Sequence, residues 1–251
     1  MSKNKSAKVL VFANEKGGVG KTTGAREVAG VLKKNKKILL IDADFQRNLT
    51  GSLIDEPQGT IYDVMTGKDI KDCIISVCDN VDLIPGDLAL RHLDEDLRDT
   101  INTHSILKEQ LEKIEKDYDY IIIDCRPAMG EIEKNALVCA DFLIVPIEPH
   151  YFSLDGLDIL QSYSEALRGL LKASLKTVVY FNRVGQGNAP YDVMDMSKRD
   201  YDIILNSFIR ENVKLKEASM NQKFITDYAP RSNGAVDFKG LVLELIRNGI
   251  R

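Results

Sequence analysis

Short apolar runs alternate along this chain with segments in which apolar residues recur every three or four positions. The short runs have the length of strands that are buried on both faces, and the periodic segments have the spacing of amphipathic helices. The expected strands lie at 9–13, 38–44, 81–85, 120–124, 142–147 and 177–182, and the expected helices at 22–34, 104–116, 154–171, 189–206 and 234–247. This alternation predicts an α/β fold with a doubly wound, mostly parallel sheet flanked by helices on both faces.

The polar segments that follow four of these strands form the candidate site. In a parallel sheet the carboxyl ends of the strands meet at one edge, and functional residues gather beyond that edge. The four segments are residues 14–23, 42–48, 124–130 and 148–151. We therefore expect them to surround one ligand.

The first segment contains NEKGGVGKTTG, which is rich in glycine and leads directly into an expected helix. Gly17, Gly18 and Gly20 allow successive N–H groups to point into one concavity, and the helix N-terminus favours an anion. Lys21 is placed to contact β- and γ-phosphates, and the Thr22 hydroxyl is placed to bind Mg²⁺. The order of strand, loop and helix predicts a phosphate-binding loop that holds ATP with Mg²⁺.

A second lysine, Lys16, stands on the other side of the glycines, and Glu15 replaces the first glycine of the pattern G-x-x-x-x-G-K-[ST]. The stretch KGGVGKTT resembles the deviant Walker A loop of the ParA/MinD superfamily of P-loop ATPases. The resemblance implies that Lys21 serves the ATP of its own subunit, while Lys16 reaches the partner's ATP in a two-fold dimer. It also implies a set of residues that contact the nucleotide, namely Gly17, Gly18, Val19, Gly20, Lys21, Thr22 and Thr23.

Two carboxylates lie at the end of the second strand, in ILLIDADFQRNLT. Asp42 and Asp44 are two residues apart, so their side chains have the same general direction. One carboxylate can position water beside a triphosphate, while the other supports the loop or the Mg²⁺ shell. The stretch resembles the family segment LLIDxDPQGNLT, which implies that Asp44 orients or deprotonates the attacking water. Phe45 replaces a proline of that segment and Arg47 a glycine; Arg47 faces either solvent or a phosphate.

A third carboxylate, Asp124, ends the strand in YDYIIIDCRPAMG. This stretch resembles the Walker B region of the family, YDYIIIDCPPSLG, which implies that Asp124 holds Mg²⁺ through a water. Arg126 replaces a family proline on a loop that usually contacts the γ-phosphate and the partner subunit. The implied catalytic residues are therefore Lys16, Lys21 and Asp44, and the implied magnesium ligands are Thr22, Asp42 and Asp124.

The resemblance extends over nearly the whole chain. The stretches NALVCADFLIVPIEPHYFSLDGLDIL and FIRENVKLKEASMNQKFITDYAPRSNGAVDFKGLVLEL are similar to the ParA branch more than to the MinD branch. Asn182 and Arg183 lie where relatives contact adenine. Since no helix-turn-helix segment precedes the loop, the small form of the family is expected. That form has one P-loop ATPase domain, here residues 1–251, with residues 1–7 as a flexible tail.

Composition and charge restrict the possible binding partners more than they restrict the possible folds. The chain has 251 residues, a formal net charge of −4 and a pI near 5.5, so any DNA-binding surface must be local. No apolar run approaches the roughly 20 residues that span a bilayer, and the N-terminus has no signal-peptide pattern. The four cysteines form no CxxC pair, which indicates reduced thiols in a cytoplasmic protein.

These features together predict a DNA partition ATPase of the ParA type, which positions a plasmid or a chromosome region. The expected partners are a second copy in the ATP state, non-specific DNA and a ParB-like protein that stimulates hydrolysis, and the expected location is the cytoplasm, on the nucleoid. The basic residues expected near DNA lie in the carboxyl half of the chain: Lys198, Arg199, Arg210, Lys214, Lys216, Lys223 and Arg231. Phosphate neutralisation is cumulative, so a dimer doubles the effect of a weak patch.

Two alternatives stay open at this stage. A membrane-cycling ATPase of the MinD type carries a basic membrane-binding helix, but here the chain stops four residues after the last expected helix, so membrane binding is not expected. A metabolic ATP-dependent enzyme with the same loop, such as a dethiobiotin synthetase or an iron–sulfur carrier ATPase, is the other alternative. The carriers need cluster cysteines, and Cys125 and Cys139 lack their spacing.

Overall fold

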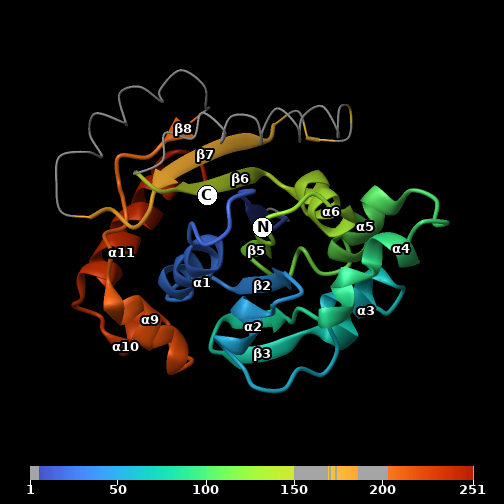
Figure 1. Cartoon of the computed structure of the whole chain (residues 1–251), viewed down its shortest axis with the longest axis horizontal. Helices are drawn as coiled ribbons and strands as arrows, with labels where there is room; N and C mark the ends of the chain where they lie inside the picture. Colours follow the sequence, from blue (N-terminus) through green and yellow to red (C-terminus); the bar gives the residue numbers. More distant parts are fainter. Residues whose placement is uncertain (1–5, 150–168, 170, 173, 186–202, 251) are drawn as a thin grey trace, which may run out of the picture.

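The described part of the protein contains an eight-stranded sheet with helices packed on both of its faces (Figure 1). The computed structural model describes residues 6–149, 169, 171–172, 174–185 and 203–250. Within these residues the predicted α/β fold with a mostly parallel sheet is confirmed.

The elements are as follows. The strands are β1 (Lys8–Phe12), β2 (Ile38–Ala43), β3 (Ile75–Cys78), β4 (Val81–Ile84), β5 (Tyr120–Cys125), β6 (Phe142–Ile147), β7 (Lys176–Phe181) and β8 (Ile203–Ile204). The α-helices are α1 (Lys21–Leu32), α2 (Asn48–Gly51), α3 (Ile61–Met65), α4 (Leu93–Asp96), α5 (Ile106–Leu111), α6 (Glu131–Cys139), α9 (Val213–Met220), α10 (Ile225–Tyr228) and α11 (Asn233–Arg247). Three 3-10 helices are η1 (Ile70–Cys73), η2 (Leu88–Arg91) and η3 (Thr103–Ser105).

The strand order places β1 at the centre of the sheet. The order is β3-β4-β2-β5-β1-β6-β7-β8, and every neighbouring pair is parallel except β3 with β4. The chain passes from β1 to β2 on one side, and later from β5 across β1 to β6 on the other. The loops after β1 and β5 therefore leave the sheet where its winding reverses, which is the usual ligand-binding place in such sheets.

Burial on both faces explains the apolar runs. All residues of β2 and β5 are buried. Alternate residues of β1 enter different cores, because successive side chains of a strand point to opposite faces. Leu10 and Phe12 share a core with residues of α1 and α11, whereas Val9 and Val11 share the other with residues of α3, α5 and α6. Figure 1 shows these two groups of helices on opposite sides of the sheet.

The last helix belongs to the core. The Ser232 Oγ atom accepts a hydrogen bond from the Ala235 N–H at 3.3 Å and caps the start of α11. Phe238, Leu241 and Leu245 on this helix are buried in the core shared with α1. Among the residues that the structure describes, no helix is both long enough and apolar enough to cross a membrane.

Two expected helices differ from the structure. The helix expected at 104–116 is shorter, because residues 103–105 form η3 and α5 ends at Leu111. Residues 203–204, expected at the end of a helix, form β8 and pair with β7. Two apolar residues such as Ile203 and Ile204 fit the periodicity of a helix and that of a strand. Their pairing with β7 makes them a strand.

Other expectations fall partly outside the described residues. Gly169 has a φ of +86°, so the helix expected at 154–171 does not run through it; residues 154–168 and 189–202 lie outside the described part. Ala7, expected in the flexible tail, is buried, and its N–H donates to the Glu115 carbonyl at 2.9 Å.

Candidate nucleotide site

The glycine-rich loop connects β1 to α1 at the centre of the sheet edge. Gly18 and Gly20 have φ values of +78° and +103°, a region that residues with a Cβ rarely adopt. A Cβ on Gly20 would also lie 2.0 Å from the Asn182 Nδ2 atom. That amide donates a 2.7 Å hydrogen bond to the Val19 carbonyl. The end of β7 therefore holds the loop, and a residue with a Cβ at position 20 would be strained and would have to displace the Asn182 amide.

Lys21 lies inside a cavity that the loop encloses. The cavity has a volume of about 340 Å³, and its lining residues are Gly17, Gly18, Gly20, Lys21, Thr22, Thr23, Asp44, Gln46, Asn48, Pro127, Arg183 and Ser219. The Lys21 ammonium donates to the carbonyl oxygens of Asn14 (2.9 Å) and Lys16 (3.1 Å). Burial lowers the pKa of Lys21, and the nearby Asp124 carboxylate opposes this shift. This cation at the N-terminus of α1 can bind a phosphate chain.

Asp124 is a buried carboxylate near the end of β5. Neither of its oxygen atoms makes a hydrogen bond to another described residue, although the Thr22 hydroxyl is close enough to lower its pKa. Desolvation and the charge of Asp42 together hold the pKa of Asp124 well above its usual range. An unpartnered buried carboxylate is costly, and a hydrated Mg²⁺ would remove that cost. Asp124 and Thr22 are therefore the residues that would hold a magnesium ion beside the phosphate cavity.

Asp42 has a different environment. Its Oδ2 atom accepts hydrogen bonds from the Thr50 N–H (2.8 Å) and hydroxyl (2.6 Å), and its Oδ1 atom accepts one from the Asp44 N–H (3.2 Å). Burial raises the pKa of Asp42 to about 6. Of the two tasks expected for this residue, these bonds favour support of the loop at 44–50 over a place in the Mg²⁺ shell.

Asp44 faces the cavity. It is 7% exposed, and its Oδ1 atom accepts a 2.9 Å hydrogen bond from the Gln46 N–H. Because Asp44 lines this cavity, its carboxylate is placed to orient a water molecule there.

Phe45 and Arg126, which each replace a proline of the family pattern, contact one another. The Phe45 ring lies under two guanidinium groups, with Arg91 4.6 Å and Arg126 5.9 Å from the ring centroid. Arg126 also donates from Nε to Glu133 at 2.8 Å. The arginine that replaces a proline is therefore held by α6 and by the phenylalanine that replaces another proline.

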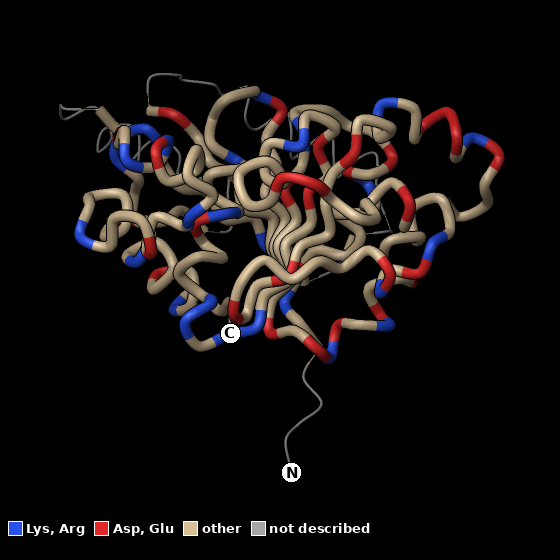
Figure 2. Tube along the Cα trace, turned by 90° about the horizontal axis from the view of Figure 1, so that it is seen from below, with Lys and Arg blue, Asp and Glu red and all other residues tan. Residues whose placement is uncertain are grey.

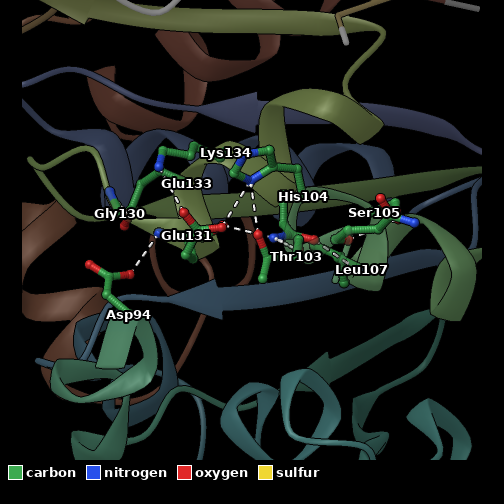
Figure 3. A network of polar contacts seen from close by, with 11 residues as sticks. Asp94, Thr103, His104, Ser105, Leu107, Gly130, Glu131, Glu133 and Lys134 are labelled. Carbon is green, nitrogen blue, oxygen red and sulfur yellow. Dashed lines mark hydrogen bonds and ion pairs between the residues drawn. The ribbon is translucent and has the colours of Figure 1, made fainter. Parts of the chain in front are cut away.

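A polar network fixes the loop after β5 to its neighbours (Figure 3). The Glu133 carboxylate accepts from the Gly130 N–H at 2.8 Å and closes the first turn of α6. Asp94 accepts from the Glu131 N–H at 2.8 Å. Glu131 in turn contacts His104 (2.8 Å) and Lys134 (2.7 Å). These contacts hold the residues that follow Pro127, which lines the cavity wall.

The conformation of Arg47 explains the glycine that relatives have there. Its φ and ψ angles are 57° and 31°, in the left-handed region. The chain neighbours Gln46 and Asn48 line the phosphate cavity, whereas Arg47 does not. Of its two expected environments, a phosphate contact is thus not favoured.

A second cavity adjoins the first on the β7 side. Its volume is about 500 Å³, which suits a nucleoside, and its lining residues are Gly20, Thr23, Asn182, Arg183, Arg210, Glu211, Asn212, Val213, Leu215, Lys216, Ser219 and Met220. Asn182 and Arg183, which are expected to contact adenine, line this cavity, but the wall from α9 was not predicted. The segment that forms this wall, ENVKLKEASM, has no motif that indicates nucleoside binding. Most of its residues only define the shape of the cavity.

Lys16 lies outside the phosphate cavity. Its ammonium is 3.5 Å from the Glu148 Oε2 atom, and its side chain is 37% exposed. The Arg183 guanidinium donates to the other oxygen of Glu148 at 3.0 Å. The two lysines of the loop therefore have different surroundings.

Comparisons with known proteins agree with this site. A family model described as an AAA domain matches residues 7–177. The chromosome-partitioning ATPase Soj of Treponema pallidum is 32% identical over 251 residues, covering 97% of this chain and 99% of that protein. The chain belongs to the ParA/MinD family of P-loop ATPases. The resemblance of its three motifs to that family is thereby confirmed.

Solved structures support the ATPase activity and the ATP binding of this family member. A Borrelia burgdorferi protein assigned to plasmid partition and bound to AMPPNP has a TM-score of 0.81 and 27% identity, covering 96% of this chain and 99% of that chain. Cobyrinic acid a,c-diamide synthase of Mycobacterium smegmatis, bound to an ATP analogue and magnesium, shares the fold with a TM-score of 0.83 at 24% identity, covering 96% and 95%. The protein is therefore an ATPase that binds ATP.

Proposed function

We propose that this protein is an ATP-dependent switch for DNA segregation, which positions a plasmid, a chromosome region or another cargo. In the proposed cycle ATP joins two copies, and the dimer binds DNA without sequence preference. A ParB-like partner then stimulates hydrolysis, and the ADP form returns to the monomer. The protein would act in the cytoplasm, on the nucleoid. The match to a chromosome-partitioning ATPase over nearly its full length supports this function.

The observation that carries the proposal is the different placement of the two loop lysines. Lys21 is 6% exposed and lines the phosphate cavity, so it suits the ATP of its own subunit. The half-exposed Lys16 ammonium lies outside that cavity. A cation at the surface beside the phosphates can reach a nucleotide bound by a second copy, which would couple ATP binding to dimerisation as an arginine finger does.

Within one subunit the proposed roles follow the geometry. The N–H groups of residues 17–23 and the Lys21 ammonium bind the phosphates. Thr22 and Asp124 would hold a Mg²⁺ ion, which would supply positive charge beside the phosphates. Asp44 orients the attacking water. Asn182 and Arg183 border the nucleoside.

Hydrolysis by one subunit alone should be slow. Asp44 is the one carboxylate that lines the phosphate cavity within the described part of the chain, and the proposed trans cation, Lys16, is supplied by dimerisation. A slow reaction suits a switch, because the lifetime of the ATP state then carries the information and a partner can shorten it.

The distribution of charge favours the α9–α11 side as the DNA-binding surface. Residues 203–250 contain seven Lys or Arg and five Asp or Glu, whereas residues 55–117 contain seven and 16. Figure 2 shows the acidic residues concentrated on the side that carries α3 to α5. DNA would avoid that side because of repulsion between like charges.

Ion pairs narrow the candidate DNA-binding residues. Arg210 pairs with Asp237 at 2.6 Å, and Lys214 pairs with Glu217 at 2.7 Å. Lys198 and Arg199 lie outside the described residues. The exposed Lys216, Lys223 and Arg231 make no ion pair with another described residue, so we expect them to contribute most.

The test is binding to a non-specific DNA duplex with ATP, with ADP and without nucleotide, at two salt concentrations. Binding should appear only with ATP and fall steeply with salt. The double variant Lys223→Ala/Arg231→Ala, whose two residues do not line the nucleotide cavities, should lower the slope of log affinity against log salt by about 0.9 for each DNA phosphate that the protein no longer neutralises. Lys71→Ala/Lys108→Ala, which removes the same charge on the acidic side, should leave the slope unchanged. An ATP form that neither dimerises nor binds DNA would contradict the proposal, and liposome binding would then test the MinD-type alternative.

A further inference from the structure

Glu148 contacts cations from two neighbouring strand ends. It follows β6, which lies between β1 and β7 in the sheet. Its Oε2 atom is 3.5 Å from the Lys16 ammonium, which follows β1. Its Oε1 atom accepts a 3.0 Å hydrogen bond from Arg183, which follows β7. One carboxylate therefore holds the lysine of the phosphate loop and the arginine that borders both cavities.

The backbone around this contact is well fixed. The Asn14 amide donates to the Pro146 carbonyl at 2.8 Å, and the Lys16 N–H donates to the Asn14 side-chain oxygen at 2.9 Å. On the other side the Asn182 N–H donates to the Ile147 carbonyl at 2.8 Å. The loop and β7 are thus both tied to the end of β6, so the meeting of the three side chains is set by the framework.

Arg183 itself has an uncommon conformation. Its φ of +54° lies in the left-handed region, which costs energy for a residue with a Cβ. Such strain occurs where surrounding contacts over-determine a residue. The bond to Glu148 is one of those contacts.

We propose that Glu148 is a positioning residue that holds Lys16 within its own subunit until a partner's nucleotide takes the lysine. The inference rests on the proposed function, which assigns Lys16 to the partner's ATP. A triphosphate carries more charge than one carboxylate and therefore competes well for an ammonium group. Because Arg183 already neutralises part of Glu148, and because all three side chains are partly exposed, the hold on Lys16 is weak and reversible.

The consequence is a threshold for dimerisation. Each subunit must separate Lys16 from Glu148 before the dimer closes, so the contact opposes assembly in both copies. Glu148→Gln keeps the shape of the side chain and removes its charge. A weak ion pair changes an equilibrium by about threefold. Because a dimer contains two Lys16–Glu148 contacts, Glu148→Gln should lower the dimer dissociation constant by about tenfold.

The experiment measures dimer formation against protein concentration by sedimentation, with a non-hydrolysable ATP analogue and Mg²⁺. We expect Glu148→Gln to dimerise at lower concentration than the unaltered protein, and Glu148→Asp, which keeps the charge, to stay near it. The control is Asp69→Asn, because Asp69 pairs with Lys113 at 3.0 Å on the exposed acidic side. That variant should dimerise as the unaltered protein does.

A double-variant comparison separates positioning from a structural role. At protein concentrations high enough for the Lys16→Ala protein to form some dimer, Glu148→Gln should have no further effect on dimerisation, because the lysine is then absent. The affinity of the monomer for a fluorescent ATP analogue should stay within about twofold in all Glu148 variants. Thermal unfolding checks that each variant is folded.

Dimerisation of the unaltered protein distinguishes a failure of the proposed function from a failure of the role proposed for Glu148. If the unaltered protein does not dimerise with the analogue, the proposed function is wrong, and the role of Glu148 is wrong with it. If the unaltered protein dimerises but Glu148→Gln assembles equally well or less well, the role of Glu148 alone is overturned. The same holds if Glu148→Gln acts equally in the presence and absence of Lys16.

Discussion

The nucleotide site has a buried floor and an open rim, and the two are built in different ways. The floor consists of Gly20, Lys21, Asp42 and Asp124, which are buried or, at Gly20, too crowded for a Cβ. The rim consists of Lys16, Glu148 and Arg183, whose side chains are 37%, 21% and 50% exposed. Steric fit and desolvation fix the floor, whereas exposed ion pairs hold the rim. Substitutions in the floor should therefore abolish binding, and substitutions in the rim should change assembly.

The largest effect is expected for Lys21→Ala. The variant removes the one ammonium group that lines the phosphate cavity among the described residues, and charge-assisted hydrogen bonds contribute about 1.5–3 kcal/mol each. ATP affinity should fall by about 100-fold or more, as measured by titration with a fluorescent ATP analogue. An exposed control, Lys108→Ala, should bind normally; comparable binding by Lys21→Ala would show that the cavity is not the ATP site.

Lys16→Ala should sharpen the contrast between floor and rim. Because the Lys16 side chain does not line the phosphate cavity, ATP affinity should stay within about twofold of the unaltered protein, while ATP-dependent dimerisation is lost at the protein concentrations at which the unaltered protein is dimeric. Light scattering after size-exclusion chromatography measures the dimer. A Lys16→Ala protein that dimerises normally would remove the basis for a trans lysine.

Gly20→Ala tests how rigid the floor is. The new Cβ would meet the Asn182 amide and would also force a residue with a side chain to a φ of +103°. Backbone strain and overpacking together should lower the free energy of unfolding by about 2–4 kcal/mol, as measured by urea denaturation.

The matched control for that variant is Gly67→Ala. Gly67 has a similar φ of +113°, but its Cβ would meet no atom within 4 Å. It should lose only about 1–2 kcal/mol from backbone strain. Equal losses in the two variants would mean that Asn182 moves aside easily and does not clamp the loop.

The smallest effect is expected for Arg47→Gly. Glycine removes the strain of the left-handed backbone, about 1–2 kcal/mol, but loses part of that gain to greater freedom of the unfolded chain. The free energy of unfolding should rise by about 0.5–1 kcal/mol. Arg47→Ala removes the same side chain but keeps the strain, so it should give no such gain; a gain there would point to the side chain instead.

The floor could be predicted from the sequence because its signals are local. A buried strand, a run of glycines and a lysine stand within a few residues of one another, and Asp124 ends an apolar run. Each signal reports the conformation of its own segment. The main strands were predicted for the same reason, since their apolar runs have the length of buried strands.

The contacts of the rim could not be predicted, because they join residues far apart in the chain. Lys16 and Arg183 were expected at the site, but nothing in the sequence pairs either of them with Glu148; the strand order brings the three together. The pairing of Phe45 with Arg126 was missed for the same reason. The edge strand β3 was also missed, because its residues are only partly buried and give no clear apolar run. Helix α6, although mostly buried, was not among the expected helices.

The bond between Asn182 and Val19 also bears on the order in which a newly made chain can acquire its parts. It spans 163 positions, and the central strand β1 gains its second neighbour, β6, only with residues 142–147. A ribosome-bound chain that lacks these residues has the glycine-rich segment but not the framework that shapes it. Ligands stabilise only states that bind them. ATP can therefore stabilise the complete folded protein, but it cannot stabilise the first half of the chain before the rest has been synthesised.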